Sequence, residues 1–592
     1  MTSPNVVTPI AATVVEVIVH AGTAVREGVV VAIVEAMKME HEIRAHADGI
    51  VSEIFVVQGD VVDAGTTLMC VTPQAAPAAV EDAAAGATGD SPAHEGIVRP
   101  ALADLGARLA LVQDAARPAA VAKRHALGLR TARENVADLC DPGSFVEYGA
   151  LAVAAQSQRR TVDDLMRNTP ADGMVTGIGT IAGTRCVVMA YDATVLAGTQ
   201  GHRNHQKTDR MLGLAHDEKL PVVLFAEGGG GRPGDVDLPI VAGLHVPTFA
   251  RYAKLAGRVP VVAIVAGRCF AGNAALAGCS DVIIATRDSN IGMGGPAMIE
   301  GGGLGVFRPV QVGPADVLDR AGVIDVLCDD EAAAVVAAKR YLGFVVPDSP
   351  KPFTAPDQAA LRDALPTNRV RAYDVRPIVA TLADAHSVLE LRPRFGAALL
   401  TFLARIEGRA VGLLASQSAD GGGAIDGDAA DKAARFMDLC NAHGLPLVSL
   451  IDTPGFMVGP EVEAQGQVRH AGRLFIANAR LRIPLVAVVL RKAYGLGAMA
   501  LTGGGFHAAS AIVSWPSGEF GAMGLEGAVR LGYRKELEAA SEGAQRDALY
   551  ERLVAEQYAR GGALDMAATL EIDAVVDPAE TRSWIARRLG FM

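Results

Sequence analysis

Two patterns of hydrophobic and polar residues divide this chain into parts of different kinds. Residues 5–72 alternate β-branched and polar residues, as in TVVEVIVH, VVVAIVE and IVSEIFVVQGD. Such alternation, interrupted by glycine-bearing turns, predicts strands. From about residue 100 onward, apolar runs end in glycine-rich loops, as in LPVVLFAEGGGG. The patterns therefore predict a small all-β module followed by a much larger α/β part.

The first part repeats itself. AGTAVREG at 21–28 matches QGDVVDAG at 58–65, which pairs Gly22 with Gly59 and Gly28 with Gly65 at an offset of 37. A repeat of this size predicts two similar β halves packed face to face. Lys38, in VEAMKMEHEI, lies near the midpoint between the halves. We expect it on a hairpin turn that projects into solvent.

The second part repeats over a longer interval. LPVVLFAEGGGG at 220–231 parallels LPLVSLIDTPGF at 445–456, and VPVVAIVAGRCFAGNAALAG at 259–278 parallels IPLVAVVLRKAYGLGAMALTGG at 483–504. The offsets are 225 and 224. Two independent matches at nearly one offset predict tandem copies of one domain. In each copy an apolar strand runs twice into a loop of small residues.

Strand-end loops of small residues leave backbone N–H groups without partners. These groups attract a negative oxygen, and two such loops side by side can form an oxyanion hole. A single GGGG run is more often only a tight turn. Four equivalent loops in two copies favour the catalytic interpretation.

Two further segments connect these parts. Residues 74–93, QAAPAAVEDAAAGATGDSPA, have almost no large apolar residues and predict a flexible tether. Beyond it, apolar residues recur at spacings of three and four from Ala122 to Leu139, which predicts one helix that stops at Asp141-Pro142-Gly143.

Composition excludes several classes of function. The chain has 592 residues, which predicts three or four domains, and a net charge of -12, which disfavours nucleic acid as a partner. Its seven scattered cysteines contain no zinc-type spacing, so we expect reduced thiols, a cytoplasmic protein and no metal. No signal peptide or membrane-spanning run is present, and we expect no membrane partner.

The EAMKME sequence around Lys38 resembles the biotinylation motif of biotin carboxyl carrier domains, and so does the whole of residues 1–73. The resemblance implies that Lys38 carries biotin through an amide bond formed by a biotin protein ligase. The flanking Met37 and Met39 favour biotin over lipoate, whose domains usually show D-K-A. An ordinary solvated lysine is the alternative.

From about residue 100 to the end, the chain resembles acyl-CoA carboxyltransferases, which have two crotonase-like domains in tandem. The resemblance rests on KRH…TARE…DPGSF (123–145), DGMVTGIGTIAG (172–183), the GGGGR loop and DTPGFMVG (452–459). It implies main-chain oxyanion donors at Gly230, Gly231, Ala271 and Gly272 in the first copy, and at Gly455, Phe456, Gly495, Leu496 and Gly497 in the second. Leu496 stands at a position that is usually glycine. The leucine can alter the shape of the hole but keeps the main-chain donor.

Together the resemblances imply a biotinyl domain at 1–73, a linker at 74–93, and crotonase-like domains at 94–345 and 346–592. The implied function is carboxyl transfer between biotin on Lys38 and an acyl-CoA. One hole would hold the biotin ureido oxygen and the other the thioester enolate oxygen. No segment remains for a biotin carboxylase, so we expect a separate ATP-dependent subunit, and a homo-oligomer built from dimers, possibly a hexamer.

Several details stay open at this stage. His202, His205 and Lys207 could contact CoA phosphates, but a solvated polar turn is an equal alternative. Met499 falls near the position where family members tune the acyl pocket, and it is not the residue associated with propionyl specificity. The alternative functions are a biotin-dependent acyl-CoA decarboxylase and a non-catalytic biotin carrier or assembly subunit.

Overall fold

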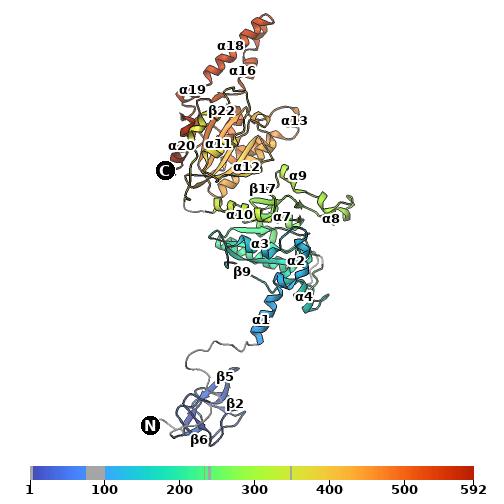
Figure 1. The fold of residues 1–592 in the computed structure, drawn as a ribbon, viewed down its shortest axis with the longest axis vertical. Coiled ribbons are helices and arrows are strands. Elements are labelled where there is room, and N and C mark those ends of the chain that lie inside the picture. The colour runs from blue at the N-terminus through green and yellow to red at the C-terminus, as the bar shows by residue number, and fades with distance from the viewer. Residues whose placement is uncertain (1–4, 75–99, 233, 238–241, 347–349, 592) are drawn as a thin grey trace. The chain divides into compact units, whose positions relative to one another are not determined.

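The computed structural model describes residues 5–74, 100–232, 234–237, 242–346 and 350–591. The chain forms two compact units, Met1–Val98 and Arg99–Met592, which are described separately (Figure 1). Of the predicted flexible tether at 74–93, residues 75–93 lie outside the described residues. Within the described ranges, no helix is long and apolar enough to cross a membrane.

The first unit contains two four-stranded antiparallel sheets, of order β1-β8-β6-β3 and β5-β4-β2-β7. The strands are β1 (Asn5–Val7), β2 (Ala12–Val17), β3 (Ala24–Val25), β4 (Val30–Ala36), β5 (Met39–Arg44), β6 (Gly49–Ile54), β7 (Val61–Val62) and β8 (Thr67–Pro73). Each sheet takes two strands from each half of the repeat. The halves therefore exchange strands, and the expectation that they pack face to face was wrong. Pairing β1 with β8 and β2 with β7 gives each half hydrogen-bonding partners that it lacks alone.

The core of the first unit repeats at the same offset of 37 as its turns. Val14 and Val51 are both buried, and so are Val34 and Val71. The four repeat glycines adopt matching left-handed backbones, with φ of 94° and 93° at Gly22 and Gly59, and 87° at both Gly28 and Gly65. Only glycine adopts this conformation without strain, so the turns specify where each strand ends.

The second unit contains two sheets with the same topology. The first has the order β17-β15-β13-β12-β11-β10-β9, antiparallel from β9 to β11 and parallel from β11 to β17. Its strands are β9 (Val146–Glu147), β10 (Met174–Ile181), β11 (Thr184–Tyr191), β12 (Val222–Phe225), β13 (Val261–Val265), β15 (Val282–Thr286) and β17 (Val326–Cys328), and a separate pair is β14 (Arg268–Phe270) with β16 (Asn290–Gly292).

The second sheet has the order β18-β19-β20-β21-β22-β23-β25, with β24 also paired to β22. Its strands are β18 (Leu389–Leu391), β19 (Leu399–Ile406), β20 (Arg409–Ser416), β21 (Leu447–Thr453), β22 (Leu485–Tyr494), β23 (Ala511–Ser514), β24 (Glu519–Gly521) and β25 (Ala574–Val575). The β10–β11 hairpin and the β19–β20 hairpin match residue for residue at an offset of 225. The tandem repeat expected from the loops thus extends through whole sheets.

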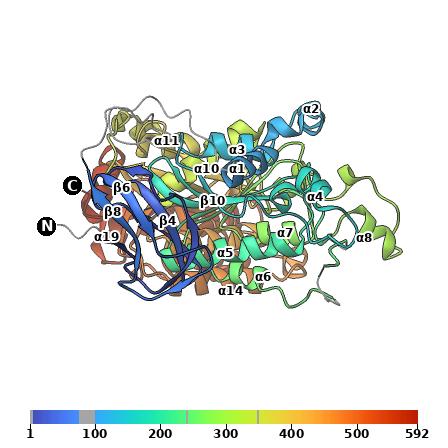
Figure 2. The ribbon, with the colours of Figure 1, turned by 90° about the horizontal axis from the view of Figure 1, so that it is seen from below.

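Helices cover both faces of the first sheet. Figure 2 shows α3 (Ala132–Leu139) and α10 (Glu331–Val345) on one side of β10, and α5 (His202–Glu218), α6 (Thr248–Ala253) and α7 (Gly272–Gly278) on the other. The α10 side shares its core with α12 (Gly427–Ala442) of the second copy. The two copies therefore pack on each other through buried apolar surface.

The remaining helices lie at the start of the unit, between these elements and at its C-terminal end. They are α1 (Pro100–Leu111), α2 (Pro118–His125), α4 (Val162–Asn168), α8 (Pro296–Gly301), α9 (Ala315–Arg320), α11 (Arg376–Leu382), α13 (Pro460–Glu463), α14 (Gln467–Ala479), α15 (Gly495–Leu501), α16 (Leu525–Gly532), α17 (Arg534–Ala539), α18 (Ala544–Arg560), α19 (Ala563–Ala568) and α20 (Thr581–Arg588). In Figure 1, α8 and the α16–α18 segment extend outward from the body.

The predicted single helix from Ala122 to Leu139 was wrong, because the segment contains two helices. Gly128 adopts φ of 73° after α2. Thr131 then caps α3, accepting from the Glu134 N–H at 3.1 Å while the Glu134 carboxylate accepts from the Thr131 N–H at 2.7 Å. A reciprocal capping box starts a new helix even where the apolar spacing continues.

We predict that Gly22→Ala and Gly59→Ala destabilise the first unit equally, each by about 1–2 kcal/mol, because both force an L-residue into a left-handed backbone. A Cβ at either position meets nothing within 4 Å, so strain is the only cost. Urea unfolding of residues 1–74, followed by circular dichroism, measures the loss, and the double variant should be additive. Clearly unequal losses would contradict the structural repeat.

Candidate active site

Lys38 lies at the tip of the β4–β5 hairpin. Ala36 pairs with Met39, so the turn contains only Met37 and Lys38, with φ of 53° and 65°. Two consecutive positive φ values are typical of a type I′ turn, which matches the twist of the flanking strands. Met37 is 97% exposed, and Lys38 is exposed too. The tip therefore presents a primary amine to solvent on a rigid support, as attachment of biotin through an amide requires.

In the first repeat copy, two of the predicted donors already have partners. The Gly230 N–H donates to Asn273 Oδ1 at 3.2 Å, and the Ala271 N–H donates to the Gly292 carbonyl at 2.9 Å. The amides of Gly231 and Gly272 have no partner among the described residues. The available donors of this loop pair are thus the N–H groups of Gly231 and Gly272.

These two loops lie in contact. A Cβ added to Gly230 would lie 2.7 Å from Ala271 Cβ and 3.6 Å from the Gly272 nitrogen. At Gly231 an added Cβ would meet nothing within 4 Å, and the residue is exposed. The Gly231 side of the loop therefore faces open space, where a ligand has access.

The second copy builds the same arrangement with different side chains. The Gly455 N–H donates to Thr453 Oγ1 at 3.1 Å, whereas the Phe456 and Leu496 amides have no partner among the described residues. A Cβ added to Gly497 would lie 2.6 Å from Gly455 Cα and 3.0 Å from the Phe456 nitrogen. Gly497 therefore allows the two loops to approach each other closely.

Backbone angles follow the repeat at both loops. Gly230 and Gly455 have φ of 88° and 117°, and Ala271 and Gly495 have φ of 53° and 57°. A non-glycine residue in this region carries strain of about 1–3 kcal/mol, which is often found at functional sites. Each copy thus turns its chain sharply at the strand end and leaves the next amide unpaired.

The interpretation of His202, His205 and Lys207 changes with the structure. They belong to α5 rather than to a solvated turn. Lys207 is half-buried, its Nζ donates to the Ala171 and Met174 carbonyls, and loss of solvation lowers its pKa to about 8. At the start of the helix the His202 N–H donates to the Asp235 carboxylate at 2.8 Å. Lys207 is therefore not placed to bind a CoA phosphate.

Comparison with known proteins finds a matching family for each of the two parts of the chain. Residues 123–591 match the family model described as "Carboxyl transferase domain", and residues 1–71 match the model described as "Biotin-requiring enzyme". The chain belongs to the carboxyl transferase family. It is the carboxyltransferase of a biotin-dependent acyl-CoA carboxylase, with a biotinyl domain fused in front.

Individual relatives give the same result. The methylmalonyl-CoA carboxyltransferase 12S subunit of Propionibacterium freudenreichii subsp. shermanii is 34% identical over 479 residues, which cover 79% of this chain and 90% of the relative. A solved structure of the transcarboxylase 12S hexamer, with methylmalonyl-CoA bound, matches with a TM-score of 0.74 and 32% identity over 83% of this chain and 94% of that one. The structure of a single-chain, multi-domain long-chain acyl-CoA carboxylase has a TM-score of 0.79 and 50% identity over 98% of this chain. This chain spans only 56% of that one.

The carboxyltransferase has a cavity of about 740 Å³ beside its second loop pair. Gly495 and Met499 contribute to its wall, and Met499 is 37% exposed. Most of the other lining is apolar, from Phe506, Phe520, Leu525, Ala528 and Met566, with polar groups at His507, Gln557, Arg560 and Glu571. The cavity can receive an apolar group next to the free amides.

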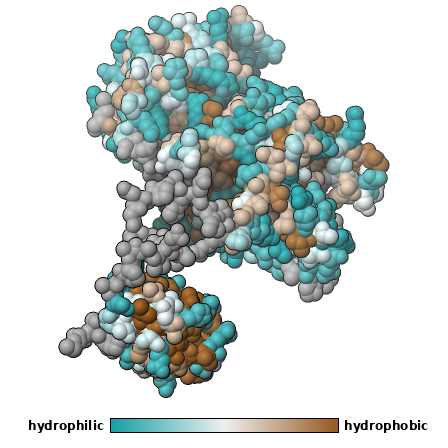
Figure 3. All heavy atoms as spheres, turned by 60° about the horizontal axis from the view of Figure 1, so that its bottom comes forward, coloured by the Kyte–Doolittle hydropathy of each residue, from teal (hydrophilic) through white to brown (hydrophobic). Residues whose placement is uncertain are grey.

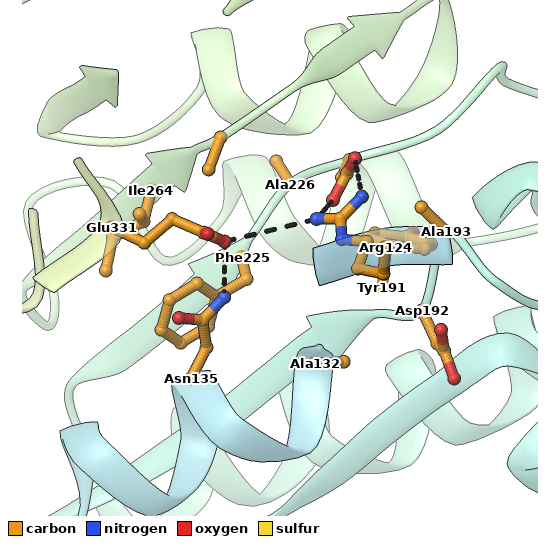
Figure 4. Close-up of a pocket in the computed structure, with 12 residues that line it drawn as sticks. Arg124, Ala132, Asn135, Tyr191, Asp192, Ala193, Phe225, Ala226, Ile264 and Glu331 are labelled. Atoms are coloured by element: carbon orange, nitrogen blue, oxygen red, sulfur yellow. Dashed lines mark hydrogen bonds and ion pairs between the residues drawn. The ribbon is translucent and has the colours of Figure 1, made fainter. Parts of the chain in front are cut away.

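Sequence reasoning missed the ionic network under the first loop. Glu227 immediately precedes Gly228, and Arg124 of α2 donates to its two carboxylate oxygens at 2.6 Å each. Figure 4 shows Arg124, Asn135 and Glu331 converging, and Asn135 donates to Glu331 at 2.7 Å. Burial raises the pKa of Glu227 to about 7, while the bonds from Arg124 act in the opposite sense. The chain separation of 103 residues left no local signal for this pairing.

Two cysteine thiols are packed in the core of the second unit. Burial raises the pKa of the Cys140 thiol to about 11 and that of Cys186 to about 12, as expected for packed thiols. In the part of the chain that the structure describes, no group of three or more His, Cys, Asp or Glu side chains could hold a metal ion.

We predict that alanine at two loop glycines has different effects on stability. Gly497→Ala should destabilise the second unit by about 1–3 kcal/mol, because its Cβ would overlap Gly455. Gly231→Ala should change the free energy of unfolding little, since open space surrounds that position. Thermal unfolding of the two full-length variants measures both. A stable Gly497→Ala protein would contradict the close approach of the loops.

Proposed function

We propose that the transferase moves a carboxyl group between biotin on Lys38 and an acyl-CoA, using the free amides of both loop pairs. Gly231 and Gly272 would hold one oxygen, and Phe456 and Leu496 the other. The single observation that carries this proposal is the repeated pattern of one engaged amide followed by one free amide. Gly230, Ala271, Gly455, Gly495 and Gly497 then shape the loops rather than serve as the principal donors.

The residues present fit biotin. When attached, biotin supplies a ring nitrogen that carries the carboxyl group and exchanges a proton with the acyl-CoA α-carbon. Lys38 supplies the amine, and its positive-φ turn holds that amine away from the sheet. Met37 and Met39, 97% and 65% exposed, provide apolar surface beside the attachment point.

The loop amides act by electrostatics. An N–H group held in place before the ligand arrives needs no reorganisation when negative charge develops on an oxygen. Asn273 and Thr453 engage the neighbouring amides, which would hold each loop with its free N–H available to the ligand. The protein thus contributes position and fixed dipoles, while cofactor and substrate contribute the proton transfer.

We also propose that the acyl group is long and apolar. The carboxyl group must pass between the two oxygens, so a thioester held at the first loop pair would place its acyl chain towards the second, where the cavity beside Gly495 is largely apolar. The 50% identity to a protein described as a long-chain acyl-CoA carboxylase adds support. Met499 lies at the wall of this cavity, in agreement with its expected role in the acyl pocket.

The proposed partners follow from the reaction. An ATP-dependent biotin carboxylase must load the carboxyl group, and a biotin protein ligase must attach biotin. Apolar side chains reach the surface of the first unit (Figure 3), including Phe55, Val57 and Val61, and offer such proteins a contact surface. We also propose domain boundaries at 93/94 and 345/346 and a cytoplasmic location. All seven cysteines are free thiols, which supports a reducing compartment.

We propose a homo-oligomer, for which the 12S hexamer is a described parallel. The segment around α8 exposes large apolar side chains: Met293, Met298, Leu304, Val306 and Val310 are 57% to 78% exposed. Apolar surface of this kind commonly marks a protein contact. Light scattering that shows only monomers would exclude this part of the proposal.

We predict that Lys38→Arg abolishes biotin attachment completely while leaving the fold unchanged, because guanidinium does not form the required amide. Intact mass after co-expression with a biotin ligase measures the modification. Lys219→Arg, also on an exposed left-handed lysine, is the matched control and should keep biotin. Biotin retained by Lys38→Arg would refute the assignment.

We predict that Gly231→Val and Gly497→Val impair different steps. Gly231→Val keeps the N–H group but adds bulk where the ligand must approach it. Exchange of acyl-CoA α-protons with solvent should therefore slow by about a hundred-fold or more, comparable to the loss of an oxyanion donor. Gly497→Val should chiefly slow release of the carboxyl group from loaded biotin. Isotope exchange and single-turnover assays separate the steps. Normal rates in a folded Gly231→Val protein would show that the loops are only turns.

We predict that Met499→Trp lowers kcat/KM for long-chain acyl-CoA at least about ten-fold more than for acetyl-CoA, since the indole fills the cavity. A panel of acyl-CoA thioesters of increasing length measures this. An equal effect on every thioester would exclude the cavity as the acyl pocket.

A further inference from the structure

A carboxylate with little exposure precedes the first loop of each loop pair. Glu227 lies three residues before Gly230, and Asp452 lies three residues before Gly455. The Asp452 side chain is 1% exposed, and that of Glu227 is 13% exposed. Glu227 lies two residues after the end of β12, and Asp452 is the second-last residue of β21, the two strands that lead into these loops. An unpaired charge at such a position would be strongly destabilising.

Each carboxylate is bound by one arginine in a two-point geometry. Arg124 donates to both oxygens of Glu227 at 2.6 Å, and its Nε donates to the Arg130 carbonyl at 2.8 Å. Arg491 donates to the two oxygens of Asp452 at 2.9 and 3.4 Å. The two arginines are themselves buried, with side chains 9% and 4% exposed.

The arginines come from different places in the chain. Arg491 belongs to β22, and the position that matches it in the first copy, at the offset of 224, is Gly267. A Cβ on Gly267 would lie 2.4 Å from Glu227 Oε1, so this glycine leaves room for the carboxylate. Arg124 reaches the same carboxylate from α2, outside the repeated sheet. The two copies thus build the same ion pair by two routes.

Further hydrogen bonds link the two carboxylate residues to a glycine loop or to a neighbouring strand. The Glu227 carbonyl accepts from Asn273 Nδ2 at 2.9 Å, and Asn273 Oδ1 in turn accepts the Gly230 N–H. In the second copy, Asp452 Oδ1 accepts the Lys492 N–H at 3.0 Å. Each ion pair is therefore connected by hydrogen bonds to the glycine loop or to the strand beside it.

We infer that Arg124–Glu227 and Arg491–Asp452 are positioning pairs, each of which holds its glycine loop so that the following amide faces the ligand. A buried ion pair adds little net stability compared with apolar residues of similar volume. Its two-point geometry, however, defines orientation as well as distance. This inference rests on the proposed function for its catalytic meaning, but the loop ordering is measurable without any reaction.

The test compares Glu227→Gln, Asp452→Asn and the control Asp325→Asn in the full-length biotinylated protein. Asp325 is fully buried, is bound by Arg392 and accepts the Ile283 N–H at 2.7 Å near the start of β15. The loops lie at the opposite, carboxyl ends of the parallel strands. Alkaline pH keeps Glu227 ionised in the reference protein, because burial raises its pKa to about 7.

Hydrogen exchange of the loop amides is the first readout. Glu227→Gln should speed exchange in residues 228–232 about ten-fold or more and leave 453–457 unchanged, and Asp452→Asn should do the reverse. Asp325→Asn should lower overall stability without changing either loop. Unchanged loop exchange in the first two variants, or equal changes in all three, would overturn the inference.

A double variant separates positioning from packing. Arg124→Met with Glu227→Met removes both charges and should regain the stability that Glu227→Gln loses. If the pair positions the loop, hydrogen exchange of the loop amides should stay fast in this double variant, and kcat should stay low with KM unchanged. Recovery of loop protection and kcat together with stability would show that the pair only fills space. If Gly231→Val is fully active while loop protection still depends on Glu227, the proposed function fails and the positioning inference survives.

Discussion

Backbone N–H groups without a partner among the described residues, at four strand ends of the second unit, explain why its sheets and loops are built as they are. A buried or half-buried N–H group normally finds a partner, because leaving it unpaired costs about 1–3 kcal/mol. The second unit leaves one amide unpaired after each of Gly230, Ala271 and Gly455, and engages the preceding ones through Asn273, Gly292 and Thr453. Such a pattern needs parallel strands that end side by side, and loops of small residues that touch. The tandem sheets provide both.

The two copies reach this arrangement with different side chains. Asn273 occupies in the first copy the place that Gly497 occupies in the second, so one copy binds its glycine amide from the neighbouring loop and the other from Thr453 within the same loop. The ionic support differs in the same way, since Arg124 comes from outside the repeat and Arg491 from within it. What the copies share is the place of the free donors, which directly follow matching positive-φ residues in both loops of each pair. Fixed donors are what transition-state stabilisation uses.

Local patterns predicted the parts that depend on local physics. The Lys38 hairpin, the repeats and the strand-to-loop transitions follow from alternation and glycine positions, and the structure contains all of them. Which loop amides remain free could not be predicted, because the partner of the Gly230 N–H is the side chain of Asn273, 43 residues away. The strand exchange in the first unit and the partial burial of Lys207 depend on long-range pairing. The break before Thr131 depends on a helix cap that outweighs the apolar periodicity.

The central claim is that one chain carries biotin and also transfers the carboxyl group. Its most direct test supplies the biotinylated protein with a malonyl-type CoA thioester labelled in the free carboxyl group, without ATP and without any other protein. The account predicts that label becomes attached to the protein in proportion to its biotin content, and that Lys38→Arg acquires none. Absence of label on the biotinylated protein, or equal labelling of Lys38→Arg, would contradict it.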